Sequence, residues 1–335
     1  MQTRSLAGRY APRYTRNSAA ERFFDLNMGP HDALFSLLST RELVRLMQTS
    51  RRVRALVLDV CFDVSSLLRR FFGSPANVKE FRRMQQQTGT IISGSMGLQF
   101  LNRLAYEDSD LDIYVRRATA PLAIIFLQGI GYTWIPREAQ DNNLSLQLPI
   151  SLNDQWKSYL GRGIADVFDF RKGDEKIQLI IAKTAPMDII LSFHSTCVMN
   201  VITHSAAISL YPWYTFVMKQ ALIIETVGAK QEIGRQKYID RGWEMLKLPS
   251  ANNNTEIGVR IPRSIGDSYT WTIPLPPLSS ARANMMGMDL DMDTEMDTDV
   301  ETSLSLVPSA WMVDCNKWKA VTTVLSTPNQ PSWIH

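Results

Sequence analysis

Two aspartates two positions apart, Asp110 and Asp112, are the residues of this sequence with the clearest chemical potential. Side chains alternate across a β-strand, so in the stretch DSDLDIYV both carboxylates would project from one face, about 6 to 7 Å apart. Hard carboxylate oxygens at that spacing suit Mg²⁺ or Mn²⁺ better than zinc. Four acids fall within residues 107–112. Their mutual repulsion would be relieved by a cation, so we favour metal binding over a solvated turn.

A glycine and a serine upstream of the aspartates have the properties of a phosphate-binding turn. Residues 90–93 have the apolar character of a short strand, and an apolar-periodic helix is expected over residues 96–104. Between them, Gly94 would let the backbone approach a phosphate, and Ser95 would offer a hydroxyl and an amide near the helix N-terminus. This order of strand, turn, helix and Asp-x-Asp strand suits phosphoryl-type transfer from a nucleoside triphosphate.

Gly94-Ser95 followed by Asp110-x-Asp112 between apolar residues resembles the signature of the polymerase-β-like nucleotidyltransferase superfamily. The chain is also similar to a group of fungal proteins that join an F-box-like N-terminus to this fold, in the stretches TGTIISGSMGLQFLNR, SDLDIYV, EKIQLI and FHSTCVMN. This second resemblance covers most of residues 28–245. The superfamily resemblance implies that the chain binds a nucleoside triphosphate together with Mg²⁺ (or Mn²⁺). In an active enzyme, an acceptor hydroxyl of RNA, protein or a small molecule would attack the α-phosphorus and release pyrophosphate.

The superfamily also implies a third carboxylate on a neighbouring strand, and this sequence departs from that pattern. In the strand KIQLII, Gln178 stands where the acid is expected. A glutamine can offer an oxygen to a metal or a nucleobase, but it cannot act as a general base on the acceptor. Asp169 in the preceding strand could substitute for this acid. We favour the simpler interpretation, that Asp169 is a surface residue on an edge strand. Asp166 would lie on the opposite face.

The N-terminal part of the sequence is expected to be helical. Residues 28–87 form an F-box-like helical module in this interpretation, after a basic disordered arm over residues 1–27. Within it, residues 28–62 predict two or three short helices, with Ser39-Thr40 capping one of them. The resemblance implies that residues 28–62 dock onto a cullin ubiquitin-ligase adaptor. A generic amphipathic helical hairpin explains the same pattern about equally well.

Beyond the central stretch, strands and helices alternate in a way that indicates the α/β class. A helix is expected over residues 120–128, and residues 165–181 predict a hairpin with its turn at Lys172-Gly173-Asp174-Glu175. One or two helices are expected over 182–211, and further helices over 214–227 and 231–246. The predicted fold is thus an α/β (α+β) nucleotidyltransferase-like mixed sheet with flanking helices in residues 88–250, preceded by a small helical module.

The C-terminal part changes in composition. Residues 251–335 predict an irregular tail that includes an acidic low-complexity segment over 283–305, with seven acids between Asp289 and Glu301. The three cysteines are widely spaced without a CxxC pair, which disfavours a disulfide framework or a zinc site. A formal net charge of +3 is too small to imply nucleic-acid binding by itself. Without a membrane-length apolar run, we expect a cytoplasmic or nuclear protein.

Other residues that could bind ligands have simpler explanations. His194 and Cys197 would share a helix face with His204 further along, but core packing explains them better than a metal site. Four basic residues of a later helix could reach a triphosphate, namely Lys230, Arg235, Lys237 and Arg241. The simpler explanation is that they form a basic helix face exposed to solvent. The sequence therefore favours a nucleotide-binding domain that uses Gly94, Ser95, Asp110, Asp112 and Gln178. The alternative is a non-catalytic F-box-like adaptor or interaction protein with a degenerate nucleotidyltransferase fold.

Overall fold

The computed structural model of this chain describes residues 30–106, 109–153, 163–224, 228–247, 261–278, 311–314 and 317–320. The chain divides into two compact units, of which the first ends at Val57 and the second begins at Leu58. None of the described helices combines the length and the apolar character that crossing a membrane requires. The predicted basic arm over residues 1–27 and the acidic segment over 283–305 lie outside the described residues.

The described part of the first unit is helical. It contains α2 (Pro30–Leu37), α3 (Thr40–Leu46) and the first turns of α4 (Arg51–Cys61). Ser39 and Glu42 form a capping box at the start of α3. The Ser39 hydroxyl accepts a hydrogen bond from the Glu42 amide at 3.3 Å, and the Glu42 carboxylate accepts one from the Ser39 amide at 2.7 Å. Because these bonds satisfy amides at the helix start, the predicted helix start at Ser39-Thr40 is confirmed.

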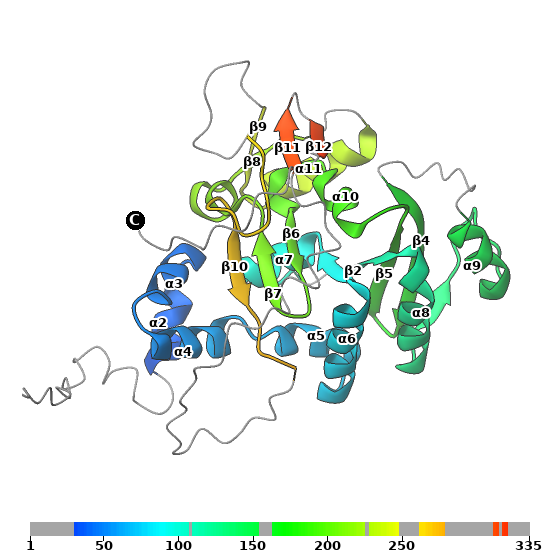
Figure 1. The fold of residues 1–335 in the computed structure, drawn as a ribbon, viewed down its shortest axis with the longest axis horizontal. Coiled ribbons are helices and arrows are strands. Elements are labelled where there is room, and N and C mark those ends of the chain that lie inside the picture. Colours follow the sequence, from blue (N-terminus) through cyan, green and yellow to red (C-terminus); the bar gives the residue numbers. More distant parts are fainter. Residues whose placement is uncertain are drawn as a thin grey trace, which may run out of the picture. The chain divides into compact units, whose positions relative to one another are not determined.

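The second unit is built on a mixed eight-stranded sheet with the strand order β10-β7-β6-β1-β2-β5-β4-β3 (Figure 1). Its strands are β1 (Ile91–Ser93), β2 (Leu111–Arg116), β3 (Thr133–Ile135), β4 (Ile164–Lys172), β5 (Glu175–Ala182), β6 (Asn200–Ile202), β7 (Ala206–Ser209) and β10 (Trp271–Pro274). Among these described strands, only β2 and β5 pair in parallel. The α/β class with a mixed sheet and flanking helices, as expected from the sequence, is confirmed.

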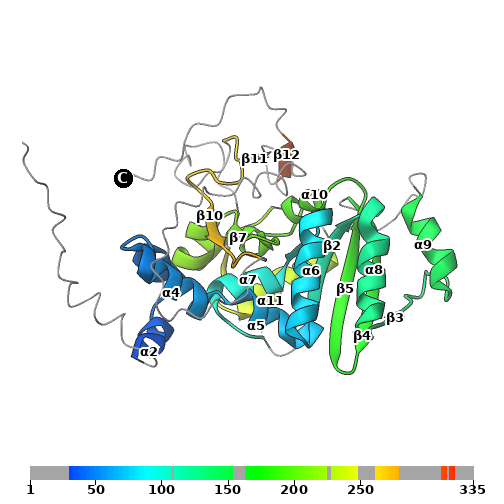
Figure 2. The same cartoon turned by 60° about the horizontal axis from the view of Figure 1, so that its bottom comes forward.

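Helices flank this sheet; two of them precede its first strand and the others lie in connections between strands (Figures 1 and 2). They are α5 (Val64–Phe72), α6 (Pro75–Thr88), α7 (Ser95–Asn102), α8 (Ala120–Gly129), α9 (Leu144–Leu152), α10 (Pro186–Leu191) and α11 (Ala229–Asp240). The expected order of strand, helix, strand and helix is present as β1, α7, β2 and α8. The expected hairpin is present as β4 and β5, with Lys172 opposite Glu175 across the turn. Two small pairs stand outside the main sheet, β8 (Gln220–Leu222) with β9 (Glu244–Leu246) and β11 (Trp311–Asp314) with β12 (Lys317–Ala320).

The expectation of one or two helices over residues 182–211 is wrong for most of this range. Only α10 is an α-helix there, and β6 and β7 follow it as an antiparallel pair. Every residue of both strands is buried, so their side chains show no polar alternation that would reveal a strand. Short apolar runs of this kind cannot be told from buried helix by periodicity. The turn between the strands is stabilised by Thr203, whose hydroxyl accepts a hydrogen bond from the Ala206 amide at 3.0 Å.

Helices α5 and α6 belong to the second unit, although the sequence suggested a domain boundary after residue 87. Phe72 of α5 and Phe81 of α6 are fully buried, and both rings contact Phe126 of α8. The Tyr132 hydroxyl donates a hydrogen bond to the Phe71 carbonyl at 2.9 Å. The aromatic side chains of α5 and α6 therefore pack with α8 in the core of the second unit.

Part of the predicted irregular tail is ordered against the sheet. Residues 271–274 form β10, which pairs with β7 at the edge of the sheet. Buried Arg82 donates hydrogen bonds to the carbonyl oxygens of His204 and, at 2.7 Å, of Pro276. The prolines that suggested irregular chain are compatible with this strand, because Pro274 is its last residue and an edge strand tolerates the missing amide hydrogen.

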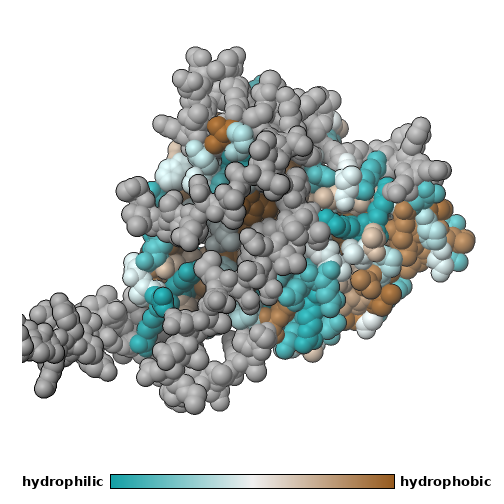
Figure 3. Space-filling view, in the orientation of Figure 1, coloured by the Kyte–Doolittle hydropathy of each residue, from teal (hydrophilic) through white to brown (hydrophobic). Residues whose placement is uncertain are grey.

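The second unit also exposes apolar side chains on two of its helices. Leu122 and Ile125 of α8 are 51% and 66% exposed, and Leu146 of α9 is 56% exposed. Figure 3 shows hydrophobic surface on the side of the molecule where Figure 1 places α8 and α9. Helix α8 is apolar around its whole circumference, so packing one side on the sheet leaves the other side in contact with solvent.

Candidate functional site

A glycine turn joins β1 to α7 and lies directly against Asp112. Gly94 adopts a positive φ of 71°, and a Cβ atom built on it would lie 2.8 Å from Asp112 Oδ2. Only glycine fits there, because a side chain would be strained by the backbone and would clash with the carboxylate. Gly97, one turn later, is equally constrained: its Cβ would lie 2.5 Å from the Asn200 carbonyl oxygen. The N-terminal turn of α7 is therefore held close to both β2 and β6.

Strand register places Asp112, Gln178 and Asp169 in one row across the sheet. Asp112 pairs with Gln178 of β5, and Gln178 pairs with Asp169 of β4. Directly opposed residues of neighbouring strands have their side chains on the same face. Gln178 is thus the nearest neighbour of Asp112 in the row, while Asp169 lies two strand spacings away, about 10 Å. The structure therefore pairs Asp112 directly with Gln178 and separates it from Asp169 by that glutamine.

Two basic side chains accompany these carboxylates. Lys176, two residues before Gln178 on the same strand face, places its Nζ 2.8 Å from Asp110 Oδ2 and 4.0 Å from Asp169 Oδ1. Arg137 binds Asp169 through both carboxylate oxygens, at 2.8 and 2.9 Å. The expectation of Asp169 as a surface residue on an edge strand is wrong, since β4 lies between β5 and β3 and the side chain is 18% exposed.

Charge and burial perturb the ionisation of Asp112. Burial raises the pKa of its carboxyl from 3.8 to about 7, and the neighbouring charge of Asp110 adds to this rise, against the opposing effects of Lys176 and Lys237. Tyr114, two residues along the same strand face, has a pKa well above its ordinary value, chiefly because of burial. A carboxyl whose charge is disfavoured in this way gains from any cation that binds beside it.

The loop before β2 and helix α11 complete the surroundings of the aspartates. Gln99 of α7 accepts a hydrogen bond from the Tyr106 amide at 2.7 Å and donates one to the Ser109 hydroxyl at 3.0 Å. It thereby fixes the residue next to Asp110. The Arg241 guanidinium, just after α11, lies 3.6 Å from the centre of the Tyr106 ring. The charge of Lys237 on α11 reaches Asp112 and Asp110 electrostatically.

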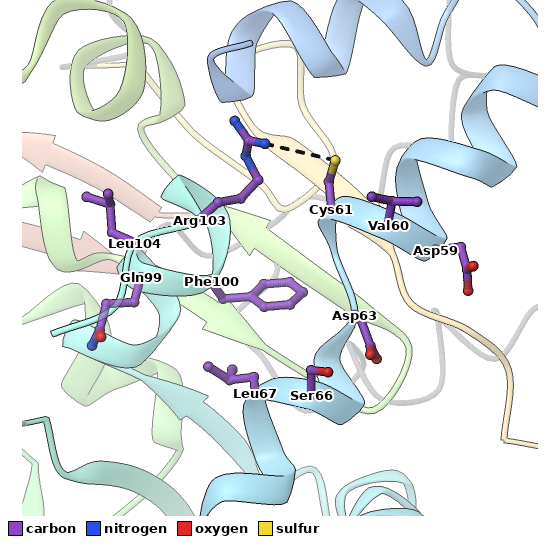
Figure 4. A pocket seen from close by; sticks show the side chains of 10 residues that line it. All are labelled: Asp59, Val60, Cys61, Asp63, Ser66, Leu67, Gln99, Phe100, Arg103 and Leu104. Carbon is purple, nitrogen blue, oxygen red and sulfur yellow. Dashed lines mark hydrogen bonds between the residues drawn. The ribbon is translucent and has the colours of Figure 1, made fainter. Parts of the chain in front are cut away.

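A separate pocket of about 310 Å³ lies at the other end of α7. It is lined by Asp59, Val60, Cys61, Asp63, Ser66, Leu67, Gln99, Phe100, Arg103 and Leu104 (Figure 4). Arg103 points toward Cys61, with its Nη1 atom 4.0 Å from the sulfur. Neither the glycine turn nor the aspartate pair lines this pocket, so it is distinct from the site that the sequence indicates.

His194 and Cys197, which were weighed as metal ligands, make other contacts in the structure. Cys197 is buried in a short 3-10 turn, and burial raises the pKa of its thiol to about 12. His194 Nδ1 lies 2.7 Å from the Ser195 hydroxyl, and its ring packs against Tyr238 of α11. Within the described residues, no three histidine, cysteine, aspartate or glutamate side chains gather as a metal-binding group.

Sequence reasoning missed three residues around the aspartates, namely Lys176, Arg137 and Gln99. A signal for Lys176 was available, since strand alternation puts it on the same face as Gln178. Arg137 and Gln99 act over distances in sequence that no local pattern reveals. In comparisons with known proteins, the chain matches no family model, no curated protein and no solved structure.

Proposed function

We propose that the second unit binds a nucleoside triphosphate together with Mg²⁺ or Mn²⁺ at the Gly94-Ser95 turn and the Asp110–Asp112 pair. The observation that carries this proposal is the 2.8 Å approach between the Cβ position of Gly94 and Asp112 Oδ2. It brings the N-terminus of α7, where backbone amides favour phosphate, beside the carboxylate of Asp112, which favours a divalent ion. A magnesium triphosphate needs both kinds of group in one small volume.

The residues present fit a divalent ion held jointly with phosphate. Asp110 and Asp112 supply charged oxygens, and the amide oxygen of Gln178 is the nearest neutral one in the row. Lys176 contacts Asp110 Oδ2, so an ion that binds this oxygen would have to displace its ammonium group. Two carboxylates are fewer ligands than magnesium takes, and triphosphate oxygens and water would complete its shell. The ion would supply charge neutralisation for the triphosphate.

The geometry supports binding better than nucleotide transfer. An acceptor hydroxyl must lose a proton when it attacks the α-phosphorus, and the position beside Asp112 carries Gln178, which cannot take that proton. Asp169, the other acid of the row, is paired through both oxygens with Arg137. We therefore propose nucleotide binding as the main function and slow or absent transfer to an acceptor.

Equilibrium binding tests this proposal. Purified full-length chain is titrated with fluorescent analogues of each nucleoside triphosphate in Mg²⁺, alongside the Asp110→Asn, Asp112→Asn double variant. Asp174→Asn is the matched control, because Asp174 is an exposed acid in the β4–β5 turn. We expect the double variant alone to lose binding by at least about tenfold, the loss of a charge-assisted contact. Equal affinity of all three proteins, or no affinity in any, would remove the proposal.

Turnover is measured in the same samples. Each α-labelled triphosphate is incubated with the chain and Mg²⁺ or Mn²⁺, and label transfer and pyrophosphate are followed beside the double variant. Binding without transfer agrees with the neutral Gln178. Transfer that depends on Asp110 and Asp112 would show that the chain is a nucleotidyltransferase and would contradict the proposed lack of a base.

The N-terminal helices are the basis of a second proposal. We propose that residues 28–62 dock onto a cullin-ligase adaptor, which would make the chain a non-catalytic receptor whose second unit recognises a nucleotide or a partner. The observation that favours this is the short capped helix α3, in a compact unit separate from the sheet domain. A pull-down of purified adaptor by the full chain tests it, and absence of binding would remove this role.

A further inference from the structure

The carboxylates of the candidate site already have a cation of their own. Lys176 Nζ lies 2.8 Å from Asp110 Oδ2 and 4.0 Å from Asp169 Oδ1, and its side chain is only 23% exposed. Its charge also acts on Asp112. The β4–β5 hairpin therefore positions one ammonium group among three carboxylates. Arg137 separately neutralises Asp169. Lys176 is thus the principal counter-ion of Asp110.

We propose that Lys176 is a tethered counter-ion that must release Asp110 before a divalent ion can bind there, so that the metal binds with the nucleotide and not alone. This inference rests on the proposed function of the site. Magnesium contacts oxygen ligands at about 2.0 to 2.1 Å, which leaves no place for an ammonium on the same oxygen. The two cations also repel each other at these separations.

A triphosphate resolves this competition, because it brings several negative charges. The ammonium of Lys176 can exchange the carboxylate of Asp110 for a phosphate oxygen, and this charge-assisted hydrogen bond is of comparable strength. Asp110 then becomes available to the metal. A metal ion without nucleotide offers Lys176 no such partner. The ion must then compete with the intact ion pair between Lys176 and Asp110. The expected consequence is positive coupling between nucleotide and metal, set by one side chain.

The hairpin also supplies a matched control. Lys172 lies in β4 at the hairpin turn, where its Nζ donates a hydrogen bond to the Ile130 carbonyl at 2.7 Å. Its change to methionine removes the same charge from the same hairpin without altering the ion pair of Asp110. Any difference between the Lys176→Met and Lys172→Met chains therefore reports on the position of the charge and not on net charge.

The experiment measures binding of Mn²⁺ alone to the full chain by the electron paramagnetic resonance signal of the free ion. We expect Lys176→Met to bind Mn²⁺ at least about tenfold tighter than wild type, a gain of about 1.4 kcal/mol. Lys172→Met should match wild type. Adding Asp110→Asn to Lys176→Met should cancel the gain, which identifies Asp110 as the released ligand. Equal affinities of Lys176→Met and wild type, or an equal gain from Lys172→Met, would overturn the inference.

A substitute variant and a second measurement complete the test. If Lys176→Met does not fold, Lys176→Gln replaces it, since it removes the charge but keeps a polar end. In wild type, Mn²⁺ affinity is measured with and without a nucleoside triphosphate, and at least about tenfold coupling is expected. If Lys176→Met binds Mn²⁺ more tightly than wild type but no chain binds a nucleotide, only the proposed function is refuted. Nucleotide binding by wild type without that gain refutes the role of Lys176 alone.

Discussion

Replacing Asp112 by asparagine should stabilise the metal-free chain at neutral and alkaline pH. In the folded chain the pKa of Asp112 is raised from 3.8 to about 7, first by burial and then by Asp110. Below pH 3.8 the carboxyl is neutral in both the folded and the unfolded chain and costs nothing. Between these two pH values the unfolded chain loses the proton first, so the folded state loses stability as the pH rises. Above about pH 7 the full cost is present.

The size of the effect follows from the pKa difference. At about 1.4 kcal/mol per pKa unit, the cost of the charged carboxylate above pH 7 has an upper bound of about 4 kcal/mol. Because the Asp112 side chain is only partly shielded from solvent, we expect about half of that, roughly 2 kcal/mol. The asparagine that replaces it carries no charge at any pH. The variant should therefore gain stability over wild type as the pH is raised from about 5 to about 8.5.

Urea unfolding at several pH values, in buffer with a chelator, measures this difference. Wild type and Asp112→Asn are compared at each pH, so other titrating groups cancel, and Asp174→Asn controls for the same change at an exposed turn. A difference in the free energy of unfolding that does not change with pH would refute the reasoning. So would a variant that is less stable than wild type at the alkaline end of the series.

Three further substitutions have definite expected outcomes. Gly97→Ala should lower the free energy of unfolding by about 1 to 3 kcal/mol, because its Cβ would lie 2.5 Å from the Asn200 carbonyl oxygen. Gly129→Ala is the control in the same urea titration. It should leave the free energy of unfolding nearly unchanged, since a Cβ at Gly129 would meet open space. Gln178→Glu adds a charged oxygen beside Asp112, so Mn²⁺ affinity measured by magnetic resonance should rise; an unchanged affinity would place Gln178 outside the site. Arg82→Met removes the hydrogen bonds that the buried Arg82 guanidinium donates to the carbonyl oxygens of His204 and Pro276, so chemical denaturation should show a loss of about 1 to 3 kcal/mol.

The central stretch could be predicted from the sequence because its signals are local. A glycine turn, an apolar-periodic helix and an alternating strand each reveal themselves within ten or so residues, and the β4–β5 hairpin is indicated by its polar turn. The pairing of Gln178 with Asp112 was expected only from the family resemblance, which implies an acid at that position of a neighbouring strand. The roles of Gly94, Ser95, Asp110 and Asp112 in binding remain predictions.

Other parts of the fold depend on contacts between distant residues. Strands β6 and β7 are buried on both faces, so their composition resembles that of a buried helix. Strand β10 forms because a neighbouring edge and Arg82 hold it, and nothing in its own prolines indicates a strand. The pairing of Arg137 with Asp169 joins a loop to a strand 32 residues later, and only the structure reveals it.

The location of a bound metal–nucleotide complex shows whether the glycine turn and the two aspartates bind it together. Mn²⁺ with a nucleoside triphosphate is added to isotope-labelled full-length chain, and paramagnetic broadening of the backbone amide signals is mapped by nuclear magnetic resonance. We expect the strongest broadening at Gly94, Ser95, Asp112 and Gln178, and none of it in the Asp110→Asn, Asp112→Asn variant. Broadening confined to the pocket around Cys61, or no selective broadening at all, would contradict the account.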